Sequence, residues 1–252
     1  MSPSHTAIRI SLLGLSLMLV SCTISEEHRE PLRRPNTDAS RIPLASSRAT
    51  WEYQPPPPEM LNSMRVIGHA SRSGGSGELS LVVIAPDHAG LTIQEQPTLY
   101  WYLAQETNYP IEVTLIDAES PTPLLEARMP TPMQPGLHRV RLSDYDVYLE
   151  PDMLYEWFVA IRLDRSRRSR DIITSGGIRR IIPSAEMRAV LAQASQPNLP
   201  RLYAQASLWY DAISALSDLI EASPQASVLR QQRASLLAQV GLLEPAVHDK
   251  QL

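Results

Sequence analysis

The stretch from residue 78 to residue 182 contains a series of short apolar runs separated by turn-forming residues, and this pattern constrains the fold most strongly. The runs at 79–84, 98–103 (TLYWYL), 111–116 (IEVTLI), 124–129, 137–142, 154–163 and 172–182 are rich in β-branched or aliphatic residues, two also in aromatics. No helical spacing intervenes, so about seven or eight antiparallel strands are expected. The pattern predicts a β-sandwich of immunoglobulin-like size, with a closed barrel as the alternative.

After Pro183 the apolar spacing changes from that of strands to that of helices. Ser184 is expected to be an N-cap, apolar residues at helical spacing fill 199–220 and 226–240, and Gly241 is a fitting stop. The stretches LWYDAISALSDLIEASP and LRQQRASLLAQVGL together resemble a tetratricopeptide helix pair, and a single such unit cannot bury its apolar face by itself. Residues 183–243 are therefore predicted to form a cap of two to three helices on the sandwich, and residues 244–252 a tail.

The N-terminal residues 1–21 have the order of an exported leader. Arg9 supplies a positive charge, residues 10–20 form the apolar run, and Ser21-Cys22 follows it with the only cysteine of the chain. This arrangement resembles the lipobox of bacterial lipoproteins, in which the cysteine is lipidated and becomes the new N-terminus. The alternative is an ordinary secretory signal that leaves a free thiol. In such lipoproteins, an aspartate directly after the lipidated cysteine is associated with retention in the inner membrane. This chain has Thr23 at that position. The resemblance therefore favours the periplasmic face of the outer membrane over that of the inner membrane.

Residues 22–77 show no periodicity and are predicted to form a flexible tether. Prolines recur, residues 55–58 are four consecutive prolines, and residues 73–77 read SGGSG. A proline run favours the stiff polyproline II conformation, which suits a spacer. The alternative is a ligand for an aromatic groove with Trp51 and Tyr53 as anchors.

Several segments together resemble a known family. YQPPPP, SGGSG, LSLVVIAPDHAGLTIQEQPTLYWYLA, PGLHRVRL, LEPDMLYEWFVAIRLD and LWYDAISALSDL occur in this order. Their order is similar to that of the bacterial domain-of-unknown-function family 928 (DUF928), from about residue 53 to residue 243. The resemblance implies a fold and an envelope location, and it implies no reaction.

Composition and spacing favour a binding protein over an enzyme. The net charge of −4 gives no reason to expect nucleic acid as a partner, and the six histidines lack metal-ligand spacing, so neither metal nor cofactor is expected. We expect a non-catalytic binding or assembly module of the envelope. The alternative is a hydrolase of envelope polymers, for which the available carboxylates are Glu95, Glu106, Glu112, Asp117 and Glu156.

One charged stretch stands out in this acidic chain. Residues 162–180 carry seven arginines against Asp164 and Asp171, a local balance of +5; the arginines are Arg162, Arg165, Arg167, Arg168, Arg170, Arg179 and Arg180. Forked guanidinium groups bind phosphate bidentately, so the stretch is the candidate surface for anionic lipid or an acidic envelope partner. The alternative is a solvated hairpin whose charges prevent edge-to-edge pairing of strands.

The anchor is tested at Cys22. Replacing Cys22 with Ser removes the thiol that accepts the diacylglycerol, so palmitate labelling should be abolished and the protein should move to the soluble fraction. Labelling of cells that express the wild type or the variant, followed by fractionation, measures both effects. Unchanged labelling of the variant would contradict the anchor.

Overall fold

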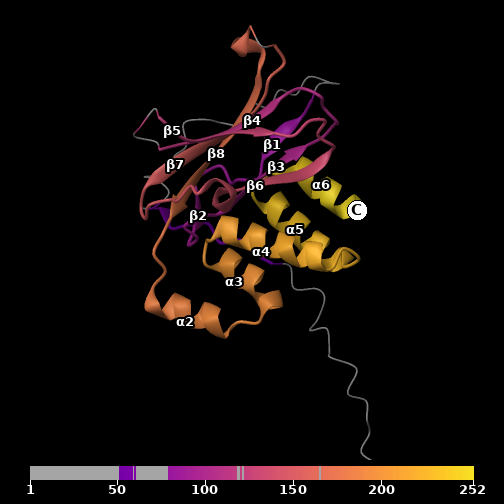
Figure 1. The fold of residues 1–252 in the computed structure, drawn as a ribbon. Helices are drawn as coiled ribbons and strands as arrows, with labels where there is room; N and C mark the ends of the chain where they lie inside the picture. Colours follow the sequence, from indigo (N-terminus) through magenta and orange to yellow (C-terminus); the bar gives the residue numbers. More distant parts are fainter. Residues whose placement is uncertain (1–50, 59, 61–78, 118–119, 121, 165) are drawn as a thin grey trace, which may run out of the picture. The chain divides into compact units, whose positions relative to one another are not determined.

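The chain folds into two β-sheets and a set of C-terminal helices in a computed structural model that describes residues 51–58, 60, 79–117, 120, 122–164 and 166–252 (Figure 1). Cys22 and most of the predicted tether lie outside the described residues. One sheet has the strand order β1-β3-β6 and the other the order β2-β8-β7-β4-β5. The strands are β1 (Leu81–Val83), β2 (Gly90–Thr92), β3 (Thr98–Leu103), β4 (Ile111–Asp117), β5 (Pro123–Met129), β6 (Gly136–Arg141), β7 (Leu154–Ile161) and β8 (Ile172–Arg180).

The two sheets pack face to face, which confirms the predicted sandwich. Alternate residues of β7 are buried, namely Tyr155, Trp157, Val159 and Ile161, because successive side chains of a strand point to opposite faces. Strand β1 of the smaller sheet lies against β7 and β8 of the larger one. The residues buried between the sheets form the core, which includes Trp101 and Trp157 with no exposed surface.

Strand β2 was not among the predicted strands. Its three residues pair in parallel with the end of β8, so that Gly90 lies opposite Ile178 and Thr92 opposite Arg180. A strand this short shows no alternation, and its partner is far away along the chain. Only the tertiary pairing therefore identifies it.

Five α-helices follow β8 in the described part of the chain, where two or three were expected. They are α2 (Ala185–Gln193), α3 (Leu199–Gln205), α4 (Trp209–Ala222), α5 (Ser227–Gln239) and α6 (Leu243–Gln251), and short 3-10 turns lie at Leu142–Tyr145, Arg168–Arg170 and Gln196–Asn198. The Ser184 hydroxyl accepts the Met187 N–H at 3.1 Å, as predicted for an N-cap. Ser207, with φ of 64°, interrupts the expected helix over 199–220.

The last residues of the chain form helix α6 where a tail was expected. Arg233 of α5 makes a bidentate ion pair with Asp249 of α6, with N···O distances of 2.6 and 2.7 Å. Both side chains are buried, and the Arg233 guanidinium also donates to the Ser217 hydroxyl of α4 at 2.9 Å. This pair holds a short helix whose sequence has little apolar periodicity.

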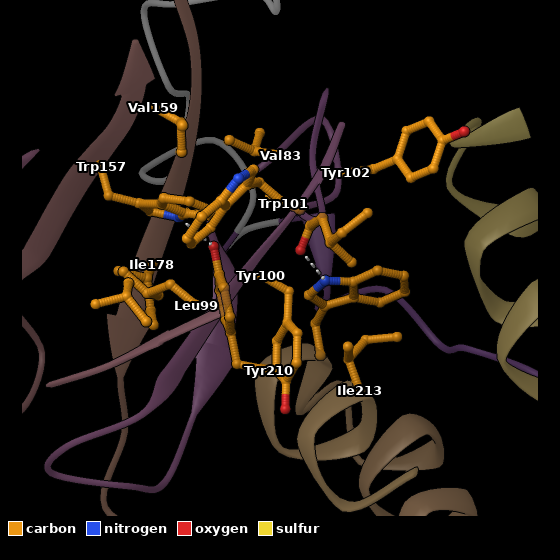
Figure 2. Packing of buried hydrophobic residues seen from close by; sticks show 14 of the residues in the cluster. Val83, Leu99, Tyr100, Trp101, Tyr102, Trp157, Val159, Ile178, Tyr210 and Ile213 are labelled. Carbon is orange, nitrogen blue, oxygen red and sulfur yellow. Dashed lines mark hydrogen bonds between the residues drawn. The ribbon is translucent and has the colours of Figure 1, made fainter. Parts of the chain in front are cut away.

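Helix α4 attaches the helices to the sandwich through its first two residues. The Trp209 indole donates to the Ile84 carbonyl at 3.0 Å, just after β1. The Tyr210 hydroxyl accepts from the Trp157 indole at 2.8 Å and donates to the Gly177 carbonyl at 2.9 Å. Figure 2 shows the Tyr210 ring reaching from the helix to Trp157 inside the sandwich. Helices α3 to α6 therefore contribute to the same core as the sandwich.

Part of the predicted tether also packs on the fold. Trp51 and Tyr53 are buried, and the Gln239 side chain of α5 binds their backbone by accepting from the Tyr53 N–H and donating to the Trp51 carbonyl. The Tyr53 ring meets Trp209 edge-on with centroids 5.0 Å apart, and its hydroxyl lies 3.1 Å from His88 Nε2. Trp51 and Tyr53, the two proposed anchors for a partner's aromatic groove, are thus buried against their own chain.

Removing the Tyr210 hydroxyl should destabilise the whole domain. Tyr210→Phe leaves the buried Trp157 indole N–H without its acceptor, which should cost roughly 1 to 3 kcal/mol, and it also removes the hydrogen bond to the Gly177 carbonyl. Chemical denaturation of the full chain measures the loss. Tyr148→Phe, at a side chain with 55% exposure, is the matched control. Equal stabilities of the two variants would contradict the attachment.

Candidate functional site

The predicted arginine stretch forms a hairpin between β7 and β8, and we call residues 162–171 the hairpin tip. In Figure 1 this tip projects beyond the neighbouring strands, away from α2, α3 and α4. Arg162 lies at its base, where its guanidinium binds Glu112 of β4 and donates to Asp171 at 2.7 Å. The hydrogen bond to Glu112 is the largest cause of a raised pKa at Arg162. Arg162 therefore stabilises the base of the hairpin.

The outer arginines of the tip face solvent. Asp164 shapes the turn by accepting from the N–H and the hydroxyl of Ser166 at 2.9 and 2.7 Å, and these bonds lower the pKa of Asp164. Arg167, Arg168 and Arg170 follow and are exposed, and no described residue forms a salt bridge with them within 4.0 Å. Arg165 lies outside the described residues. The described tip thus presents three cationic side chains together.

Arg179 and Arg180 lie at the other end of β8. Arg179 donates to the Asp152 carbonyl at 3.1 Å, and Arg180 binds the Leu149 carbonyl at 3.0 Å and Glu95 at 2.6 Å. Eight residue steps of strand separate Ile172 from Arg180, about 26 Å at 3.3 Å per step. The Debye length is about 8 Å at physiological salt, so the two ends act as separate charges.

The carboxylates available to the hydrolase hypothesis are spread over the fold. Glu95 pairs with Arg180, and Glu112 pairs with Arg162 and Arg128. Glu112 and Glu156 share the outer face of the larger sheet, but Glu156 lies opposite Ile116, four residues along β4 from Glu112. That is about 13 Å of strand, beyond the roughly 5 to 9.5 Å between the carboxyls of glycosidases.

A second candidate is a cleft of about 500 Å³ between the β2–β3 loop and helices α3 and α4, here called the Asp211 cleft. Its volume is in the range of small-molecule sites, about 300 to 1,000 Å³. The loop contributes Gln94 and Gln96, α3 contributes Tyr203, and α4 contributes Asp211, Ser214 and Asp218.

Asp211 is a buried lining residue of this cleft and connects α4 to the β2–β3 loop through hydrogen bonds. Its carboxylate accepts from the Ile93 N–H and the Gln94 amide, both at 3.2 Å, and from the Thr92 hydroxyl. Burial raises the pKa of Asp211 from 3.8 to about 6, although these hydrogen bonds lower it in part. A buried acid with a raised pKa in a cleft is typical of functional sites, although structural networks produce it too.

The sequence prediction did not include the Asp211 cleft. In the sequence, Asp211 stands out only as part of the segment LWYDAISALSDL, which contributes to the family resemblance. At helical spacing Asp211 falls with Ser214 and Asp218 on the polar side of the predicted helix, so its position gave no sign of burial. Gln94 and Gln96 gave no sign either, because they come from a loop.

Metal binding and membrane crossing have no support in the described ranges. Among these residues no three His, Cys, Asp or Glu side chains are grouped so as to hold a metal ion. No helix in the same ranges is long and apolar enough to span a bilayer.

The raised pKa of Asp211 predicts a pH-dependent stability. Between pH 3.8 and about 6 the folded protein holds a proton that the unfolded chain releases, so the contribution of Asp211 to stability falls as the pH rises through this window. The difference in unfolding free energy between wild type and Asp211→Asn should therefore drop by on the order of 3 kcal/mol between about pH 4 and about pH 7. Denaturant titrations at both pH values measure it, with Asp144→Asn as an exposed control. A difference that does not change with pH would contradict the shift.

Comparison with known proteins adds the family. The family model DUF928, a domain of unknown function, matches residues 67–250, which include every strand that the structure describes and nearly all of the helical part. No curated protein matches the sequence. The match covers far more than half of the chain, and the protein belongs to the DUF928 family.

Proposed function

We propose that this protein is a lipid-anchored component of the bacterial cell envelope that acts as a non-catalytic binding module. Cys22 is its anchor, and the hairpin tip binds an anionic surface that carries phosphate groups, such as lipid headgroups. The observation that carries this proposal is the exposure of Arg168 and Arg170 in one 3-10 turn and of Arg167 at its N-cap.

The construction of the tip supports the proposal. Arg162, Glu112 and Asp171 form an ion-pair network at the base, so the outer arginines extend from a base that ion pairs hold in place. A fixed base reduces the conformational entropy that is lost when a partner binds. Guanidinium groups suit phosphate because their forked donors match its oxygens. The positive tip also acts locally despite the net charge of −4, because salt screens distant charges.

The positions of the carboxylates favour this proposal over the hydrolase alternative. Glu95 and Glu112 are neutralised by arginines, and Glu156 lies far along the sheet from Glu112. Burial raises the pKa of Glu156, and none of the other four carboxylates contributes to that shift. A binding role requires only the tip.

Vesicle binding tests the tip. Each basic residue near an anionic membrane contributes about 1 kcal/mol, so Arg167→Ser with Arg168→Ser should weaken binding by roughly thirtyfold. The full chain carrying Cys22→Ser, which removes the lipid anchor, is sedimented with phosphatidylglycerol vesicles. Raising the salt from about 50 to about 300 mM should weaken wild-type binding in the same direction.

A matched charge control separates the tip from net charge. Arg188→Ser with Arg201→Ser removes the same charge from α2 and α3 and should leave binding nearly unchanged. Equal losses for the two double variants, or binding that is insensitive to salt, would contradict the proposal. Unchanged binding with increased light scattering of the tip variant would show that the arginines only prevent aggregation.

A further inference from the structure

The Asp211 cleft has a chemistry that the anchor and the hairpin tip do not use. Its described lining includes the carboxylates of Asp211 and Asp218 and contains neither Lys, Arg nor His. An anionic ligand would therefore meet two acids and no cation in the wall. The cleft does not suit phosphate or carboxylate ligands.

A buried amide distinguishes between the remaining ligand classes. Gln96 lines the cleft, but its Nε2 atom is covered and has no acceptor among the described residues. A buried donor without an acceptor costs about 1 to 3 kcal/mol, so turning the Gln96 amide toward a ligand acceptor in the cleft would recover this energy. An ammonium ion has donors only and would leave the amide unpaired. The ligand must offer acceptors as well as donors.

The other polar groups of the cleft also both donate and accept. Ser214 and Thr98 contribute hydroxyls, and Gln196 contributes an amide. The Tyr203 phenol is protonated at neutral pH and can both donate and accept. Burial, and to a lesser extent the nearby Asp211 carboxylate, raise its pKa further. Tyr203 thus offers a hydroxyl beside an aromatic ring, which suits a ligand with polar edges and an apolar face.

We propose that the Asp211 cleft binds a short, uncharged, hydroxyl-rich ligand, namely a segment of a saccharide. Its hydroxyls supply acceptors for Gln96 and donors for Asp218, and a sugar ring packs its apolar face against Tyr203. Asp211 already accepts from at least three donors at the end of β2 and in the loop after it, so it shapes the wall that presents Gln94. The proposal depends neither on lipidation nor on the hairpin tip.

Titration calorimetry on the full chain tests the cleft. The neutral probes are maltotriose, cellotriose and the trimer of N-acetylglucosamine, and spermidine and citrate are the charged comparators. At least one neutral trisaccharide should bind saturably, and neither charged compound should bind in the cleft. Gln96→Leu and Tyr203→Phe should each weaken that binding about three- to tenfold, the value of one hydrogen bond.

Matched variants outside the cleft control for general effects. Gln225→Leu and Tyr148→Phe make the same chemical changes at exposed positions and should leave the affinity unchanged. Tyr203→Phe keeps the ring, so it remains informative if Gln96→Leu does not fold. Failure of all three trisaccharides, binding of spermidine alone, or saccharide binding that neither cleft variant weakens would each overturn the proposal.

Discussion

The first turn of α4 is the point on which the rest of the structure depends. Three consecutive side chains point from it in different directions and bind three parts of the sandwich. Trp209 binds the end of β1, and Tyr210 binds strands β7 and β8. Asp211 binds the β2–β3 loop. Successive helical residues are rotated by about 100°, so this turn must be buried on all sides. The sandwich and the helices therefore share one core and cannot be regarded as separate modules.

This attachment sets the neighbouring backbone. A Cβ atom at Gly90 would lie 2.8 Å from the Tyr210 ring, so β2 approaches the helix as closely as it does only because residue 90 is glycine. The same approach places the β2–β3 loop over α4, which creates the Asp211 cleft. The buried carboxylate of Asp211 is costly, and its hydrogen bonds to the loop offset part of that cost.

The arginines of this chain divide into structural and exposed groups. Arg139, Arg162, Arg180 and Arg233 each pair with a carboxylate from another element. A linear count of charge over 162–180 therefore overstates the cationic surface, because some of the positive charges already have partners. The hairpin tip remains a distinct feature because its described outer arginines extend past the end of the sheet.

The sequence alone determined the elements whose signals are local. The strand runs, the N-cap at Ser184 and the stop at Gly241 were predictable, because alternation, capping and glycine conformations act over a few residues. Their order was enough to predict a sandwich followed by helices.

Only the tertiary structure decided which distant residues meet. The pairing of β2 with β8, the Tyr210 bridge, the Arg233–Asp249 pair and the Asp211 cleft all join residues far apart in sequence. The spacing of apolar residues in the sequence does not indicate such contacts. They depend on how the sheets and helices pack, and not on the conformation of any one segment.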